Sequence, residues 1–170
     1  MQLVTSILRA FQLLFAIIVL GLSVNLAKGQ VRGSAPAETG YAAFTGGFGI
    51  VAAFVGIVAL FVDSLSGIIS GALDAVASIA FLAGGIAYAV VLKGTSCDKL
   101  RSIWDNKILS QGCYEEDDFK ICNAGVDKVK SRCHSAKADT AFMFLNFFVC
   151  VAVCGWVLFK RRGSTGASYA

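Results

Sequence analysis

The chain has 170 residues, of which 56% are hydrophobic and only 15% charged, and its formal net charge is +4 at pH 7. Soluble domains use roughly 45–50% apolar and about 25% charged residues, so a soluble globular domain is excluded. The positive charge is too small and too scattered for a nucleic-acid-binding surface. Because an ordinary domain has about 100–150 residues, we expect one membrane domain with no separate catalytic module.

Four stretches are long and apolar enough to cross a bilayer. A helix needs about 20 mostly apolar residues to span a hydrocarbon core roughly 30 Å thick, where backbone polar groups must be bonded internally. The expected spans are residues 10–27, 41–62, 68–92 and 138–159. We therefore predict an all-α integral membrane four-helix bundle, with one domain over residues 1–162 and a short tail over 163–170.

The first span has a secretory signal peptide as its alternative interpretation, because it is N-terminal and apolar. Its apolar run is longer than a usual signal core, and Arg9 is the only positive charge before it. No small-x-small cleavage site precedes Lys28. We expect the segment to be retained as a membrane helix.

Four spans place both termini on one face of the membrane and the loop 93–137 on the other. The basic cluster that directly follows the fourth span, Lys160, Arg161 and Arg162, is typical of a cytoplasmic boundary and attracts anionic lipid weakly. The Lys and Arg residues of the loop favour the opposite orientation. The charge pattern alone therefore leaves the orientation open, and the cysteines decide it.

Four of the six cysteines lie in the loop 93–137: Cys97, Cys113, Cys122 and Cys133. An even set in one exposed loop indicates disulfides, and hence an oxidising exterior or lumen. A zinc site is the alternative, but no pair has C-x-x-C spacing and the one histidine, His134, adjoins Cys133. We expect a disulfide-linked extracellular loop, cytoplasmic termini and no metal.

Helical spacing narrows the disulfide connectivity. Cys122, Val126, Val129 and Cys133 recur at helical intervals, so we expect this segment to extend the fourth helix outward. Positions eleven apart on a helix are separated by about 16 Å of rise, whereas a disulfide allows a Cα separation of about 4.4–6.8 Å. Since Cys97 and Cys133 both lie close to a span, we predict the pairs Cys97–Cys133 and Cys113–Cys122.

A short amphipathic pattern lies between the first two loop cysteines, formed by Leu100, Ile103, Trp104 and Ile108. Two interpretations remain open. The segment is either a helix on the outer membrane surface, with Trp104 as its membrane anchor, or a helix that caps the end of the bundle.

Three groups of polar residues within hydrophobic surroundings resemble a known family. They are Ile7–Gln12 in the first span, Ala72–Val76 in the third, and Arg132–Ala138 before the fourth. In order and spacing they are similar to the fungal MARVEL-domain proteins, and most of all to the fungal non-classical export protein family. The resemblance covers nearly the whole chain.

The resemblance implies a four-helix bundle with cytoplasmic termini in the plasma membrane. It also implies a role in organising eisosome-type membrane microdomains, a link to sphingolipid status and vesicle traffic, and no catalytic residues. The family keeps one cysteine soon after the third helix and another just before the fourth, which correspond to Cys97 and Cys133. Cys113, Cys122 and the short tail after Arg162 depart from the family pattern.

Arg9, at the start of the first expected span, and Asp74, inside the third, lie at similar depth. Charge in a membrane is costly and is usually paired or functional. We predict an intramembrane ion pair that fixes helix packing. A proton or ion pathway and snorkelling to the interface are the alternatives.

Small residues crowd the second and third spans, at spacings that permit close backbone contact in lipid. We predict helix packing at Gly49, Ala53, Gly67, Gly71, Ala80 and Gly84. Alternatively, they form a surface for tetraspan partners or for flat sterol rings.

The sequence shows no nucleophile–base pair and no metal cluster, and too few polar residues for a path across the membrane. Cys150 and Cys154 in the fourth span are expected to be buried thiols or sites of palmitoylation. We expect a non-enzymatic plasma-membrane organiser that contacts membrane lipids (sterol or sphingolipid), other membrane proteins or copies of itself. It would need no cofactor, small-molecule substrate or nucleic acid. An accessory subunit of a larger transporter or synthase complex is the alternative.

Overall fold

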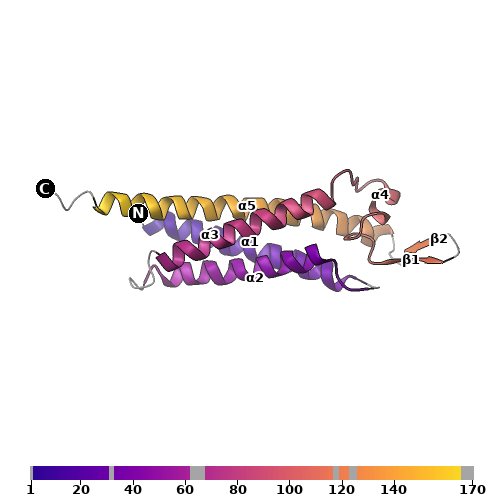
Figure 1. Cartoon of the computed structure of the whole chain (residues 1–170), viewed down its shortest axis with the longest axis horizontal. Coiled ribbons are helices and arrows are strands. Elements are labelled where there is room, and N and C mark those ends of the chain that lie inside the picture. The colour runs from indigo at the N-terminus through magenta and orange to yellow at the C-terminus, as the bar shows by residue number, and fades with distance from the viewer. Residues whose placement is uncertain (1, 31–32, 62–67, 117–118, 123–125, 166–170) are drawn as a thin grey trace.

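The computed structural model describes residues 2–30, 33–61, 68–116, 119–122 and 126–165. Four long helices dominate it: α1 (Gln2–Lys28), α2 (Ala37–Val58), α3 (Ile68–Val91) and α5 (Val126–Thr165). They form an elongated bundle with the N- and C-terminal ends at one end and a small cap at the other (Figure 1). All four helices are long and apolar enough to cross a membrane. The expected all-helical four-span fold is confirmed.

Each helix turns one stripe of residues into the bundle. On α1 the buried positions recur at intervals of three and four residues, which is the spacing that keeps side chains on one helix face. They are Arg9, Gln12, Ala16, Val19, Ser23 and Leu26. Helix α1 packs against α2 and α5, and α3 packs against the same two helices. The core therefore lies on the bundle axis and receives side chains from all four helices.

The helices extend beyond the apolar segments that predict them. Helix α1 begins at Gln2 and α2 at Ala37, before the expected starts at 10 and 41, although α2 ends at Val58, before the expected end at 62. Helix α5 has 40 residues, and at 1.5 Å per residue its length of about 60 Å is twice the thickness of a bilayer core. Hydropathy locates the apolar part of a helix, but backbone hydrogen bonding continues into the polar turns on either side.

The cap contains a short helix, α4 (Leu100–Trp104), and an antiparallel hairpin of β1 (Cys113–Glu116) and β2 (Phe119–Cys122). The expectation that the fourth helix extends outward is correct from Val126 onward but wrong for Cys122, which lies in β2. Short apolar runs fit helical and strand periodicities equally well. Here the pairing of β2 with β1 decides for the strand, and only the tertiary structure shows it.

Candidate functional site

A cluster of buried polar residues lies in the half of the bundle nearest the termini. Arg9 on α1 is 2% exposed, and its two terminal nitrogens donate to the two carboxylate oxygens of Asp74 on α3, at 2.6 and 2.7 Å. Arg9 also donates to the Ser70 hydroxyl at 2.7 Å. A two-point arginine–carboxylate contact is the strongest and most directional ion-pair geometry. The structure thus contains the expected intramembrane ion pair.

The other two helices complete this Arg9 cluster. The Gln12 amide donates to Asp74 at 2.9 Å and to the Cys150 sulfur on α5 at 3.3 Å. On α2, a Cβ added at Gly56 would lie 2.2 Å from the Arg9 guanidinium carbon, so only glycine leaves room for this side chain. Gly56 therefore lets an arginine lie buried among four helices.

A second cluster of buried polar residues lies in the half of the bundle nearest the cap. The Ser23 hydroxyl on α1 donates to Oδ2 of Asp139 on α5 at 2.7 Å. The Tyr88 hydroxyl on α3 has hydrogen-bond-type contacts with Ser23 and with Thr39 on α2, and a charge interaction with Asp139. We call these four residues the Asp139 cluster. All four are at most 1% exposed, and again each helix supplies one member.

The cap is joined to the bundle by a disulfide between Cys97 and Cys133, with a Cα separation of 5.6 Å. The predicted bond is confirmed, and it ties the chain just after α3 to the outer part of α5. Beside it, the Arg132 guanidinium donates to the carbonyls of Leu26 and Ile108, both at 2.9 Å. Leu26 is in the last turn of α1, where carbonyls lack helical partners and a cation is favourable. Arg132 therefore fastens the cap to the end of α1.

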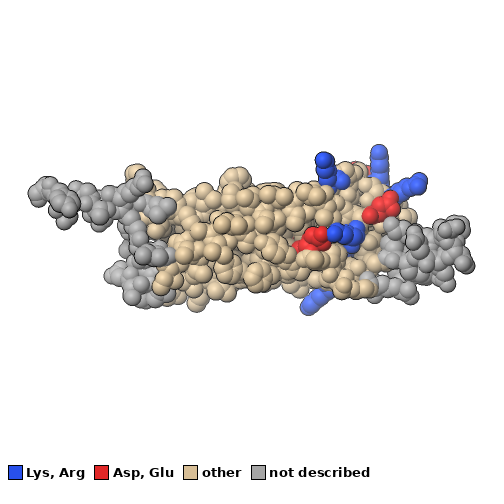
Figure 2. All heavy atoms as spheres, in the orientation of Figure 1, with Lys and Arg blue, Asp and Glu red and all other residues tan. Residues whose placement is uncertain are grey.

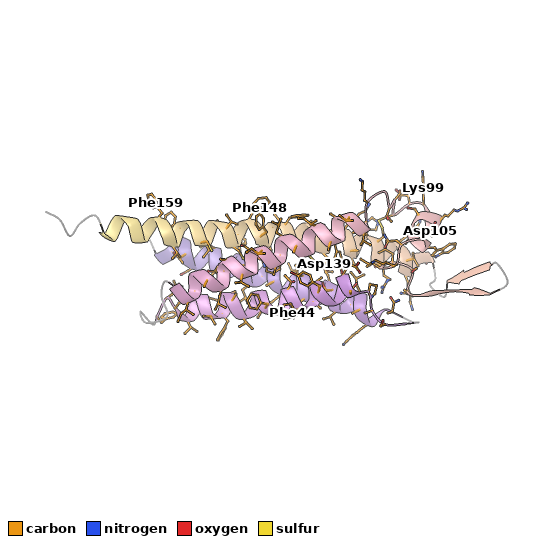
Figure 3. The ribbon with its side chains drawn as sticks, viewed as in Figure 1. Phe44, Lys99, Asp105, Asp139, Phe148 and Phe159 are labelled. Atoms are coloured by element: carbon orange, nitrogen blue, oxygen red, sulfur yellow. A yellow bond between two sulfur atoms is a disulfide. The ribbon has the colours of Figure 1, made fainter. Side chains whose placement is uncertain are left out.

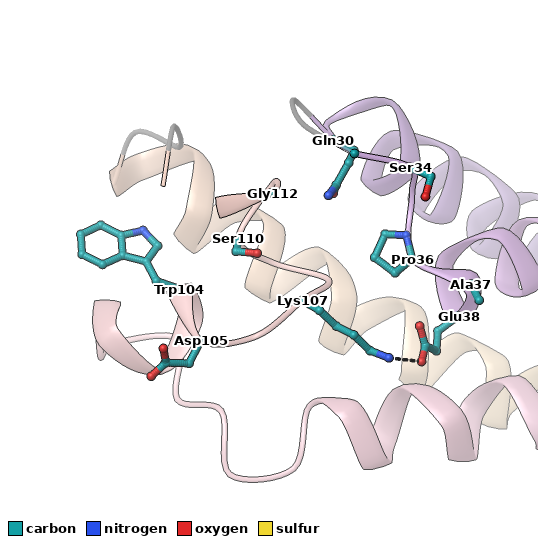
Figure 4. A pocket seen from close by; sticks show the side chains of 11 residues that line it. Gln30, Ser34, Pro36, Ala37, Glu38, Trp104, Asp105, Lys107, Ser110 and Gly112 are labelled. Carbon is teal, nitrogen blue, oxygen red and sulfur yellow. Dashed lines mark hydrogen bonds and ion pairs between the residues drawn. The ribbon is translucent and has the colours of Figure 1, made fainter. Parts of the chain in front are cut away.

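Further polar contacts hold the loop over the bundle end. The Asn106 amide donates to the carbonyl of Val91, the last residue of α3, at 2.7 Å. Lys107 forms an ion pair with Glu38 in the first turn of α2. This pair lines an open groove of about 560 Å³. Trp104, Asp105 and Ser110 also line the groove (Figure 4). The groove is at the junction of the cap with α2.

The contacts of the loop helix α4 distinguish a helix on the membrane surface from a cap on the bundle end. Helix α4 is only five residues long. Ile103 and Ile108 are fully buried, and Trp104 is half-buried and packs against the same core. These side chains face the protein, so the contacts support a cap and not an amphipathic helix on the membrane surface. The proposed membrane-anchor role of Trp104 is not supported, because tertiary contacts bury the apolar face that the pattern predicts.

The outer surface of the bundle is apolar. Charged side chains gather at the cap end, while the long middle of the molecule shows none in the same view (Figure 2). Large apolar side chains on different helices point away from the bundle, among them Phe44, Phe148 and Phe159 (Figure 3). Asp139, by contrast, is fully buried. This is the arrangement of a protein with lipid outside and polar groups inside.

The small residues pack the bundle at some positions and not at others. A Cβ added at Gly49 would lie 2.6 Å from the Phe81 ring, and one at Gly84 would lie 3.1 Å from the Met143 sulfur. Ala53 is buried, and Ala80 accepts a hydrogen bond from Tyr41 through its carbonyl at 3.4 Å. These contacts agree with the packing prediction.

Gly71 is an exception, because no atom lies within 4 Å of an added Cβ. It follows the buried Ser70 by one residue, and that step of about 100° turns it toward the edge of the helix. Glycine is therefore not required at this position for want of space, and a packing role for Gly71 stays a prediction. Gly67 lies outside the described residues.

Two other groups of expected site residues have undescribed side chains. They are Lys160, Arg161 and Arg162 near the end of α5, and the loop cysteines Cys113 and Cys122. The backbone register does place Cys113 directly opposite Cys122 in the hairpin. The Cys113–Cys122 disulfide and the anionic-lipid role of the basic cluster remain predictions.

Several residues of the two clusters and the cap were missed by the sequence reasoning. These residues are buried: Gln12, Ser70, Asp139 and Arg132. Each forms a hydrogen bond with a residue more than 60 positions away in the chain. Gln12 also bonds its neighbour Arg9, and Arg132 also bonds Ile108. A signal existed for Asp139, because it is an acidic residue inside the fourth expected span. No such signal existed for Arg132, whose partners are backbone carbonyls.

The described side chains offer little reactive chemistry. Among them, no group of three or more His, Cys, Asp or Glu lies close enough to hold a metal ion. The free thiols are Cys150, which is buried against Gln12, and Cys154, which is half-buried and donates weakly to the Gly71 carbonyl at 3.7 Å.

Comparison with known proteins gives one match. A family model described as "MARVEL: Membrane-associating domain" matches residues 2–156. No curated protein and no solved structure matches the chain. The matched region contains all four bundle helices almost entirely, with the cap between them.

Proposed function

Because the chain belongs to the MARVEL family of membrane-associating domains, we propose that this multi-pass membrane protein is a non-enzymatic organiser of the plasma membrane. It would act in the assembly of eisosome-type microdomains and in vesicle trafficking, through helix packing and contacts with lipids such as sterols or sphingolipids. The family match shows a membrane-associating domain. The roles in microdomain assembly and vesicle trafficking are part of our proposal.

One observation carries the proposal: the polar groups of the bundle point inward and the apolar groups point outward. Arg9, Asp74 and Asp139 are buried and contact other buried side chains. The lipid-facing surface is left with large apolar residues, including Phe44 and Phe54, which are 65% and 62% exposed. Such a surface can select its lipid or protein neighbours by shape, and it presents no group that reacts.

The disulfide supports the orientation that we propose. Disulfides persist in oxidising compartments, so the Cys97–Cys133 bond favours a cap outside the cell and termini in the cytoplasm. A membrane-impermeant maleimide, applied to intact cells after mild reduction, should label the cap cysteines. Labelling that requires permeabilised cells would contradict this orientation.

The function is tested in cells that lack the chain, by imaging microdomain reporters and by timing the delivery of secreted cargo. We expect the loss to disperse the reporters and slow delivery, and the intact chain to restore both. A triple variant, Phe44→Ala with Phe54→Ala and Phe148→Ala, should fold normally but fail to restore the reporters. All three side chains are exposed, so their removal changes the lipid-facing surface and not the core.

The matched control removes a similar outward area without aromatic rings: Ile17→Ala, Val51→Ala and Ile79→Ala, all exposed in the bundle. It should restore the reporters. Unchanged reporters in cells without the chain would refute the organiser role. Purification at a fixed ratio with one larger membrane protein would favour an accessory subunit instead.

A further inference from the structure

Asp74 and Asp139 are the two fully buried carboxylates among the described residues, and their surroundings differ. Both oxygens of Asp74 accept hydrogen bonds from Arg9, so its negative charge has a buried positive partner. Asp139 accepts one hydrogen bond from the neutral Ser23 hydroxyl, and its Oδ1 atom is bonded to no described residue. A buried charge without a partner is strongly unfavourable, so Asp139 requires an explanation that Asp74 does not.

The positive groups nearest the Asp139 cluster are engaged elsewhere. On α5, the Arg132 guanidinium binds the Leu26 and Ile108 carbonyls. At the start of α2, Glu38 is itself acidic and is paired with Lys107 of the cap. Lys28 on α1 and His134 and Lys137 on α5 are exposed, and no described residue forms an ion pair with Asp139.

The neighbours of Asp139 supply further oxygen atoms. The hydroxyls of Thr39 and Tyr88 are buried, and like Asp139 Oδ1 they have no described partner at normal hydrogen-bond geometry, although the Tyr88 hydroxyl is close enough to interact with Thr39 and Ser23. Tyr88 interacts with Ser23, Thr39 and Asp139, so the four side chains share one small region. Unbonded polar atoms in a native interior usually mark an ordered water or an ion.

We propose that Asp139, with the hydroxyl groups of Ser23, Thr39 and Tyr88, forms a binding site for a small monovalent cation, with Na⁺ as the preferred ion. Carboxylate and hydroxyl oxygens are hard ligands, which favour hard cations. The single carboxylate balances one positive charge. Because the four ligands come from four different helices, a bound ion ties the whole bundle together.

The groove at the junction of the cap with α2 opens near this site, although none of the four ligand residues lines it. It is lined by Glu38, the residue before Thr39, and Glu38 interacts electrostatically with Tyr88. A cation that enters the groove meets the Glu38 carboxylate, which is adjacent in the chain to the ligand residue Thr39. The Lys107 ammonium, which is 60% exposed and paired with Glu38, lies at the entrance and can move aside (Figure 4).

The test uses the full chain in lipid nanodiscs. We expect saturable binding of radioactive ²²Na⁺, and a melting temperature about 4 °C higher in NaCl than in choline chloride at the same ionic strength, because a ligand of the folded state stabilises it. Asp139→Asn should abolish both effects. The matched control is Asp127→Asn, which removes the same charge from an exposed position on the same helix and should behave as the intact chain.

Tyr88→Phe and Thr39→Val remove one hydroxyl each without changing side-chain size greatly, and they carry the test if Asp139→Asn fails to fold. Each should weaken Na⁺ binding about tenfold, which is the effect of 1.4 kcal/mol. Absence of saturable ²²Na⁺ binding by the intact chain would overturn the proposal. So would a melting temperature that responds to pH but not to Na⁺, since Asp139 would then hold a proton.

Discussion

Arg9 and Asp74 are 65 positions apart in the chain, yet the two guanidinium nitrogens of one donate to the two carboxylate oxygens of the other at 2.6 and 2.7 Å. The pair joins α1 to α3, two helices that each pack mainly against α2 and α5. It therefore connects opposite sides of the bundle through its centre. This contact and the disulfide at the other end hold the helices in register.

Substitution of Asp74 by Asn should destabilise the bundle by about 3–5 kcal/mol, because it leaves the Arg9 charge buried without its partner. Thermal unfolding in detergent or nanodiscs measures the effect. The double variant Arg9→Met with Asp74→Leu should be less destabilised, since no unpaired charge remains. A single Asp74→Asn variant as heat-resistant as the intact chain would contradict the role of the pair in packing.

Substitution of Gly56 by Ala should cost about 1–3 kcal/mol, because the new methyl group would occupy the position of the Arg9 guanidinium. Gly47 is on the same helix and is the matched control, as no atom lies within 4 Å of its added Cβ. Gly47→Ala should leave stability unchanged or raise it slightly, because Ala favours helix over Gly. Equal effects of the two changes in an unfolding assay would refute this account of Gly56.

Reduction of the Cys97–Cys133 bond should lower stability by about 4 kcal/mol on the chain-entropy model, given the sequence separation of 36 residues. The double variant Cys97→Ser with Cys133→Ser should reproduce the loss and become insensitive to reductant. Melting curves with and without reductant check both statements. A reduced chain that melts with the intact one would show that the disulfide does not hold the cap.

Loss of the Arg132 side chain should loosen the cap, because the carbonyls of Leu26 and Ile108 lose a charged donor. Limited digestion with trypsin at the exposed Lys99 and Arg101 is the measurement, and Arg132→Ala should be cut about tenfold faster. Lys130 is exposed on the same helix, so Lys130→Ala should be cut at the rate of the intact chain. Similar rates for the two variants would argue against the contact.

The facing positions of Cys113 and Cys122 in the hairpin lead to a chemical prediction. Residues directly opposite in an antiparallel pair have Cα atoms about 4.5–5.5 Å apart, within the range that a disulfide allows. Mass spectrometry of unreduced peptides should find Cys113 linked to Cys122 and separate from the Cys97–Cys133 link. Free thiols at both positions in protein from an oxidising compartment would refute the pairing.

Much of the fold could be predicted from local composition. The four spans follow from apolar length, and the Cys97–Cys133 bond follows from the closeness of both cysteines to the membrane surface; the helical-rise argument against Cys122 rested on a helix that starts only at Val126. Arg9 and Asp74 could be paired because charge inside a membrane needs a partner and few candidates existed. In each case a single strong physical requirement left one solution.

The cap and the Asp139 cluster could not be predicted in this way. Trp104 and Ile103 have a helical pattern that fits a membrane surface or a bundle end equally well, and only their burial decides. Cys122 fits a helix by spacing, but its pairing with β1 places it in a strand. Arg132 binds two backbone carbonyls, which leave no mark in the sequence.

The sequence by itself therefore determined that this chain is a membrane bundle of four apolar helices, with a loop joined to α5 by a disulfide. The reason is that the bilayer and the disulfide geometry impose lengths that can be counted along the chain. The tertiary structure alone decided which polar groups meet at the centre, why Gly56 is glycine, and that Asp139 has oxygen neighbours but no cationic one. Those relationships join residues from different helices, and they depend on packing distances that no single segment contains.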